Sequence, residues 1–70
     1  NPTYSTLRIN TGIYHSIEQL HVVDVTGRIM KIQKASNNWS EVDVSILRPG
    51  HYFIIIYTNG NRFSKPFVKL

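Results

Sequence analysis

The sequence predicts an all-β domain, an antiparallel β-sandwich of about seven short strands. Two observations lead to this fold class. Apolar and aromatic residues occur in short alternating or continuous runs, and turn-forming residues separate these runs at intervals of roughly 8–12 residues. No run has the length and pattern of a helix, and 70 residues leave room for one domain.

The central strand is expected at Tyr52–Tyr57, the longest unbroken apolar and aromatic run of the chain. Its β-branched and aromatic residues fit a pleated surface. Pro49 and Gly50 precede it and predict a type II turn. Asn59-Gly60 follows it and predicts a hairpin with a type I′ turn, so that Arg62–Leu70 folds back against the central strand.

Because side chains alternate along a strand, the central strand divides its residues between two faces. One set fills the core: Tyr52, Ile54 and Ile56. The other set forms an apolar stripe on the outside: Phe53, Ile55 and Tyr57. We expect a partner to cover this stripe, either the parent protein or a second copy through self-association. The alternative is that flanking lysine stems and loops cover it.

The N-terminal stretch predicts an extended entry and a first strand. Pro2 imposes an extended conformation on Asn1. The residues of Thr6–Asn10 then alternate, with Leu7 and Ile9 on one face, as in a half-buried strand.

Gln19–Val25 is expected to be the next strand, with Leu20 and Val22 inward. A helix is the alternative, because three apolar residues would then share a face: Ile17, Leu20 and Val23. The β-branched valines argue against the helix.

The turn after this strand is expected to form a second hairpin. Asp24 can accept hydrogen bonds from the backbone ahead of it, and Gly27 suits a left-handed corner. Arg28–Lys34 alternates again and is expected to be the returning strand. It has Met30 and Ile32 on one face, and Lys31 and Gln33 on the other.

Trp39–Val44 predicts a strand with Val42 and Val44 inward. Ser45 can begin a single tight turn that directs Leu47 into the core. Together the strands indicate an immunoglobulin-like sandwich, with a small barrel as the alternative.

Composition excludes several kinds of site. The chain has no cysteine, which excludes disulfides, cysteine metal sites and thiol catalysis. The net charge is +4, but the lysines and arginines are dispersed, so a solvated basic surface is favoured over nucleic-acid binding. The apolar runs are too short to span a bilayer, so no membrane insertion is expected.

No catalytic, metal or cofactor site is expected. The histidines and carboxylates lack the spacing of metal ligands, and the chain has no nucleophile elbow and no phosphate-binding glycine loop. The residues in question are His15, His21, His51, Glu18, Asp24, Glu41 and Asp43. The chain is therefore not expected to be an enzyme.

Pro66 removes a ladder hydrogen-bond donor from the last expected strand. This predicts that the strand lies at a sheet edge or is interrupted at Pro66. In either case Phe67–Leu70 would be accessible to another protein. The alternative is ordinary edge protection by proline and lysine.

Four segments of the chain, taken in order, form a recognisable pattern: Asn1-Pro2-Thr3, Val22–Met30, Asp43–Tyr52 and Lys65–Lys69. Together they resemble a known family, the type A C-terminal sorting domain of the type IX (Por) secretion system. The order and approximate spacing of the segments agree with that family over essentially the whole chain.

The resemblance implies the function. Such domains form the C-terminal end of larger secreted proteins of Gram-negative bacteria, so residues 1–70 would be one sorting domain excised from its parent. The folded domain would be recognised in the periplasm by the outer-membrane secretion machinery, and the N-terminal passenger would reach the cell surface or the medium. A sortase-like peptidase would then remove the domain, which performs no catalysis.

The resemblance also implies which residues carry the signal. Gly27 and Arg28 match a Gly-basic turn. Pro49, Gly50 and Tyr52 match a Pro-Gly-x-Tyr motif, and the ending matches a hydrophobic-then-basic signal at Phe67, Val68 and Lys69, closed by Leu70. The sequence departs from the family pattern at Pro66, where a strand former is usual, and at Leu70, where a basic residue is common.

Strand addition to the edge of the last strand is the recognition mechanism we expect. The alternative function is a small accessory module that binds glycan or protein at the cell surface. For glycan it would need an exposed aromatic platform, built on Trp39 with Tyr14 or Tyr57.

Overall fold

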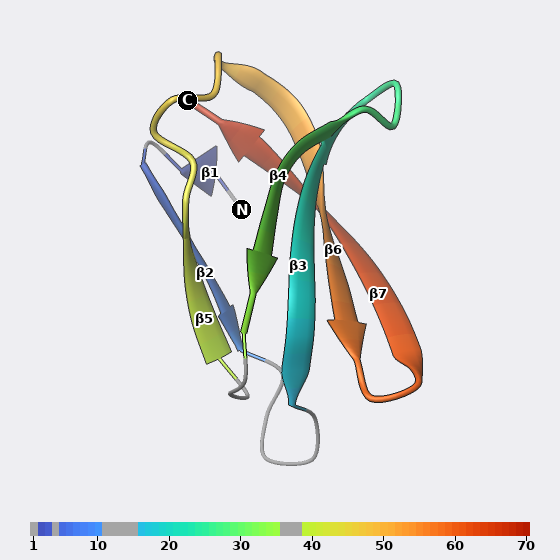
Figure 1. The fold of residues 1–70 in the computed structure, drawn as a ribbon. Coiled ribbons are helices and arrows are strands. Elements are labelled where there is room, and N and C mark those ends of the chain that lie inside the picture. The colour runs from blue at the N-terminus through green and yellow to red at the C-terminus, as the bar shows by residue number, and fades with distance from the viewer. Residues whose placement is uncertain (1, 4, 11–15, 36–38) are drawn as a thin grey trace.

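Seven strands form two facing sheets (Figure 1). The computed structural model describes residues 2–3, 5–10, 16–35 and 39–70. The strands are β1 (Pro2–Thr3), β2 (Thr6–Asn10), β3 (Ile17–Asp24), β4 (Ile29–Lys34), β5 (Trp39–Asp43), β6 (Gly50–Thr58) and β7 (Asn61–Lys69). One sheet has the order β1-β7-β6-β3-β4 and the other pairs β2 with β5. The predicted all-β sandwich is confirmed.

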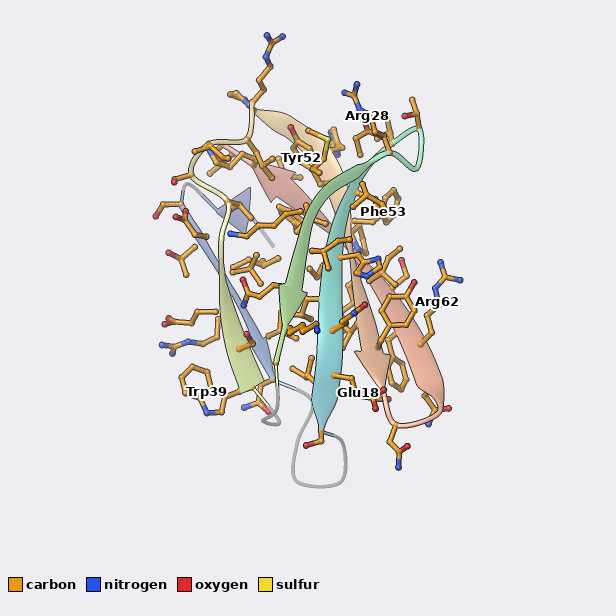
Figure 2. The ribbon with its side chains drawn as sticks, in the orientation of Figure 1. Glu18, Arg28, Trp39, Tyr52, Phe53 and Arg62 are labelled. Atoms are coloured by element: carbon orange, nitrogen blue, oxygen red, sulfur yellow. The ribbon has the colours of Figure 1, made fainter. Side chains whose placement is uncertain are left out.

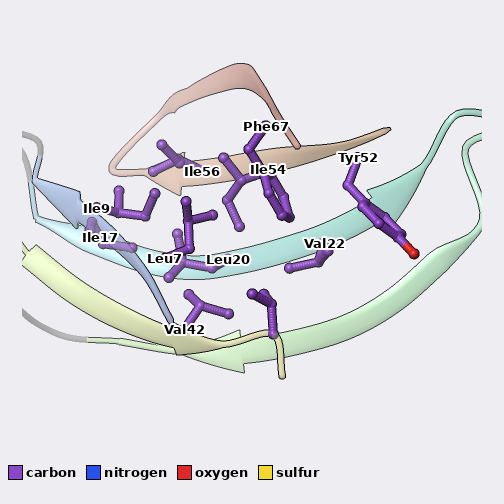
Figure 3. Close-up of a cluster of buried hydrophobic side chains, with 11 residues drawn as sticks. Leu7, Ile9, Ile17, Leu20, Val22, Val42, Tyr52, Ile54, Ile56 and Phe67 are labelled. Atoms are coloured by element: carbon purple, nitrogen blue, oxygen red, sulfur yellow. The ribbon is translucent and has the colours of Figure 1, made fainter. Parts of the chain in front are cut away.

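The core lies between the two sheets (Figure 3). The inward residues of β2, β5 and β6 are those that the alternation predicted. In β3 the predicted Leu20 and Val22 are joined by Ile17, and β7 adds Phe67. The buried cluster consists of Leu7, Ile9, Ile17, Leu20, Val22, Val42, Val44, Tyr52, Ile54, Ile56 and Phe67. A core in a domain of this size is worth roughly 3–5 kcal/mol. Single core residues therefore matter greatly to the stability of this fold.

A bulge in β3 explains why its sequence has a helix-like spacing. The register against β6 shifts between Ile17 and Gln19, so that Ile17 and Leu20 both point inward although three positions separate them. The carbonyl of Glu18, in the bulge, accepts a hydrogen bond from the N–H of Ala35 at 3.1 Å. The predicted strand is confirmed, although it covers Ile17–Asp24 instead of Gln19–Val25, and the helix alternative is wrong.

The orientation of β4 is the main feature that alternation alone left undecided. Its polar residues turn toward the second sheet and its apolar residues turn outward. Lys31 Nζ donates to the Asp43 carbonyl at 2.9 Å. Gln33 Nε2 is 2.9 Å from both the Ser40 hydroxyl and the Glu41 carbonyl. These bonds join β4 to β5 across one long side of the sandwich.

Two turns differ in type from the prediction, although the chain reverses where expected. The β6–β7 hairpin forms, but Asn59 does not take a positive φ, so its turn is not type I′; Gly60 has φ 80°. Gly50 has φ 152°, away from the value of about +80° that a type II turn needs, and it already belongs to β6. The tight turn lies earlier, where the N–H of Leu47 donates to the Val44 carbonyl at 3.0 Å.

Candidate recognition surfaces

The β3–β4 turn is held by the carboxylate of Asp24. Its Oδ1 accepts from the Thr26 hydroxyl at 2.6 Å and from the N–H groups of Thr26 and Arg28, each at 2.9 Å. Its Oδ2 lies 3.1 Å from Arg28 Nε. These hydrogen bonds, led by that of the Thr26 hydroxyl, lower the pKa of Asp24 to about 2. Gly27, at φ 87°, supplies the left-handed corner that the sequence predicted.

The Pro-Gly-x-Tyr segment forms a corner at the start of β6. The Tyr52 side chain is buried, and its hydroxyl donates to the Arg48 carbonyl at 2.7 Å. Such a tyrosine corner is typical of immunoglobulin-like sandwiches. Pro49 and Gly50 lie within the bend that this hydrogen bond closes.

The C-terminal segment is largely covered, contrary to the expectation that Phe67–Leu70 is accessible. Phe67 is 2% exposed and Lys69 is 7% exposed. In addition, β1 pairs in parallel with Val68 and Lys69 and covers the edge of β7 at that point. Of this segment only Leu70 has an exposed side chain. The reason is that alternation turns Phe67 and Lys69 toward the inside of the sandwich.

The structure brings the three sequence motifs together at one end of the large sheet. Asp24 of β3 lies opposite Tyr52 of β6, and Tyr52 lies opposite Phe67 of β7. The Tyr52 and Phe67 rings stack with centroids 5.7 Å apart. The side chain of Arg28 lies at this same end of the molecule (Figure 2).

Among the described residues, no strand pairs with the outer edge of β7 between Asn61 and Pro66, and we call this stretch the open edge. The pair Thr58–Asn61 closes the hairpin, and β7 continues through Pro66 without interruption. In a two-residue hairpin the closing pair, here Thr58 and Asn61, exchanges both backbone hydrogen bonds. Pairs with and without such bonds then alternate along the ladder. Between Asn61 and Pro66, the residues whose backbone polar groups point away from β6 are therefore Arg62, Ser64 and Pro66.

Pro66 therefore removes no bond to β6, which explains how the strand accepts it. The predicted edge position holds only in part, because β1 lies outside β7 at Val68 and Lys69, whereas Pro66 itself has no described strand on its outer side.

The outer face of the large sheet carries a wider apolar surface than the predicted stripe. The outer apolar patch comprises Val23, Ile29, Ile32, Phe53, Ile55 and Tyr57. Its members at the margin are exposed, with Ile29 at 52% and Ile32 at 54%, whereas Ile55 is only 9% exposed. His21 lies beside Ile55 in register, and its ring is 4.8 Å from that of Tyr57. Neighbouring side chains of the same chain thus cover the middle of the patch.

A family model of the secretion system C-terminal sorting domain matches residues 1–69. The chain belongs to this family. It is a C-terminal sorting domain of type IX secretion. Searches of the curated proteins and of the solved structures found no match. Membership implies secretion toward the cell surface or the extracellular space, attachment to an N-terminal passenger and interaction with the type IX machinery.

The family is one of sorting signals and not of catalysts. Within the described part of this sorting domain, no group of three His, Cys, Asp or Glu side chains could bind a metal. No helix in the same residues is long and apolar enough to cross a membrane. Three residues considered from sequence, Asn1, Tyr14 and His15, lie outside the described residues.

Sequence reasoning missed two surface features of the sorting domain. It did not place Ile32 on the outer face, since alternation gives two faces without saying which is inward. It did not place Ile29 there because a register shift between Val22 and Val23 puts Ile29 on the same face as Ile32, against simple alternation. It also did not place Arg8 and Asn10 beside Trp39. The pairing of two separate strands determines that neighbourhood, and no local signal in the sequence could have revealed it.

Proposed function

We propose that this sorting domain acts as the export address of its passenger through the open edge of β7. In this proposal the outer-membrane machinery recognises the folded domain in the periplasm and delivers the passenger to the cell surface. A sortase-like peptidase then removes the domain. The supporting observation is that, in the part of the chain that the structure describes, β7 is paired on one side only between Asn61 and Pro66.

Strand addition is the mode of recognition that suits this edge. An added strand gains affinity from main-chain hydrogen bonds and specificity from alternate side chains. The outward groups of Arg62 and Ser64 supply the main-chain partners. Pro66 lacks an N–H, so the added strand would end there, next to the point where β1 takes over the edge.

The signal residues inferred from the family resemblance act in this proposal by holding the edge in place. Gly27, Arg28 and Tyr52 stabilise the end of the large sheet against which β7 pairs. Phe67 attaches β7 to the core, while Val68 and Lys69 pair with β1 and Leu70 stays exposed.

The outer apolar patch is the second contact surface in this proposal. It adjoins the open edge, because Phe53 lies opposite Pro66 and Tyr57 lies opposite Arg62. A partner that adds a strand to β7 would reach the exposed rim of the patch. Self-association through Phe53, Ile55 and Tyr57 uses the same surface, and sedimentation velocity at increasing concentration separates these two uses.

Ser64→Pro is the variant that tests the open edge. It removes the outward N–H of residue 64, in the same way as the natural Pro66, and leaves the bonds to β6 in place. A secreted reporter fused ahead of the sorting domain should then accumulate in the periplasm. Ser64→Ala, which keeps the N–H, is the matched control and should reach the surface normally.

Thermal unfolding of the purified variants shows whether the fold survives. A folded Ser64→Pro variant that delivers the reporter as well as wild type would overturn the assignment of recognition to this edge. Deleting Phe67–Leu70 is a poorer test, because it also removes a core residue that is 2% exposed.

A further inference from the structure

Trp39 presents an apolar ring to solvent on the face of the sandwich opposite the outer apolar patch. It is the chain's one tryptophan and begins β5, where its side chain is 48% exposed. Figure 2 shows it pointing away from the sandwich, on the other side of the molecule from Phe53 and Arg62. Leaving so large an apolar ring half in water forgoes hydrophobic stabilisation, which favours a binding role over a packing role.

Polar side chains surround this ring in a fixed register. The β2–β5 pairing places Asn10 directly opposite Trp39 and Arg8 directly opposite Glu41. All four side chains lie on the outward face, because Leu7, Ile9 and Val42 fill the inward positions. Of the described residues, Arg8, Asn10 and Trp39 line a shallow, open surface hollow of about 310 Å³.

Arg8 and Glu41, which lie near the ring, form an ion pair. Arg8 donates to the Glu41 carboxylate at 3.2 Å, while both side chains keep much of their surface in solvent. A guanidinium has five N–H donors, so the ion pair leaves donors for a ligand, and the carboxylate retains acceptor positions. The groups near the indole are thus the N–H donors of the Arg8 guanidinium, the acceptor oxygens of the Glu41 carboxylate and the Asn10 side chain.

We propose that this face binds an oligosaccharide, with one pyranose ring stacked on Trp39. A pyranose has an apolar face of C–H groups and a rim of hydroxyls. The C–H face would lie on the indole, and the hydroxyls would exchange hydrogen bonds with Arg8, Asn10 and Glu41. This activity goes beyond the sorting function and uses the opposite side of the domain.

The charge of this face disfavours a nucleic acid as the ligand. Although the chain carries a net charge of +4, the outward charges of the described β2 and β5 strands are Arg8, Glu41 and Asp43. Arg8 is paired with Glu41, and the ammonium of Lys31 lies at Asp43. The face therefore has no excess of positive charge to attract a phosphate backbone, and neutral sugar hydroxyls need none.

The position of Trp39 provides a direct test, because its fluorescence reports this site alone. Wild-type protein is titrated with cellohexaose, maltohexaose, laminarihexaose, chitohexaose and mannohexaose while the emission is recorded. We expect saturable quenching or a blue shift with at least one of these probes. No change in the emission with any of the five would overturn the proposal.

Variants separate stacking on Trp39 from binding elsewhere. By calorimetry with the responding probe, Trp39→Ala should weaken binding by more than about tenfold, and Asn10→Ala should weaken it to a smaller extent. Phe53→Ala, on the opposite face, is the matched control and should bind as wild type. Wild-type affinity in a folded Trp39→Ala variant contradicts the proposal. Reporter delivery by Trp39→Ala should be normal, which keeps this test independent of the sorting function.

Discussion

The two long sides of the large sheet differ in whether other parts of the described chain bond to them. On the β4 side, Lys31 and Gln33 bond to β5 and link the two sheets. On the β7 side, the edge from Asn61 to Pro66 has no paired strand within the described residues. One side is closed by side chains, and the other is left open along a long strand.

This difference teaches how the domain controls its edges. An unpaired strand edge is a template for pairing with other chains, and natural sheets usually protect it. Here the protection on the β7 side is partial, with β1 covering one end and Pro66 limiting the donors. We therefore expect the closed side to contribute to stability and the open side to recognition.

The largest expected effect tests whether core packing holds β7 against the rest of the domain. If it does, Phe67→Ala should lower the free energy of unfolding by about 3 kcal/mol or more, which is enough to unfold much of the protein. Phe63→Ala, in the same strand but 41% exposed, should cost about 1 kcal/mol or less. Urea denaturation measures both. Equal losses would mean that strand pairing, and not the core, holds β7.

The next effect tests the closed side. Gln33→Ala removes two hydrogen bonds to β5 and should lower the free energy of unfolding by about 1–2 kcal/mol. Lys34→Ala, its exposed neighbour, should change it by less than about 0.5 kcal/mol. Hydrogen exchange should also become faster in β4 and β5 of the Gln33 variant. Unchanged exchange there would show that these bonds do not close that side.

Low pH should destabilise the β4 side of the large sheet more than the β7 side. Asp24 and Asp43 both have lowered pKa values, Asp24 through the Thr26 hydroxyl and Asp43 through its hydrogen bonds with Ser45. A lowered pKa stabilises the folded state above the unfolded-state pKa of about 4, and this contribution is lost as the pH falls toward 2. The segment from Asn61 to Leu70 contains no carboxylate side chain.

Hydrogen exchange at pH 5 and pH 2.5 measures this difference. Protection should fall more in β4 than in β7 at the lower pH. Asp24→Asn should lose part of the acid dependence and keep the part due to Asp43. Equal loss of protection in both strands would contradict the assignment of these carboxylates to the closed side.

The smallest expected effect lies at the hairpin where the open edge begins. Thr58 is 3% exposed, and its hydroxyl has no hydrogen-bond partner among the described residues. Thr58→Val replaces that hydroxyl by a methyl group and should raise the free energy of unfolding by about 1 kcal/mol. Thr58→Ser keeps the hydroxyl, loses the methyl group and should lower it. A loss of stability in the valine variant would reveal a partner for the hydroxyl.

Much of this fold could be predicted because its strands follow local rules. Alternation identified the inward residues of β2, β5 and β6, and the hydrogen-bonding of Asp24 together with Gly27 identified the β3–β4 turn. The rest depended on pairing between distant segments. The bulge at Glu18, the outward direction of Ile29 and Ile32 and the contact of β1 with β7 are set by register across strands, which no local pattern contains.

The candidate surfaces divide in the same way. Pro66 indicated the edge because a missing N–H has a direct structural meaning. The burial of Phe67 and Lys69 was missed, since the sequence does not reveal which face of an edge strand a second sheet covers. The Tyr52 corner also depends on a side chain meeting a backbone carbonyl across a bend.

The parallel pairing of β1 with β7 has a mechanical consequence. A force that separates the amino end of β1 from the carboxyl end of β7 slides the two strands past each other, because they run in the same direction. The hydrogen bonds between them then share the load instead of opening one by one. The short contact of Pro2 and Thr3 with Val68 and Lys69 therefore resists such a force by shear.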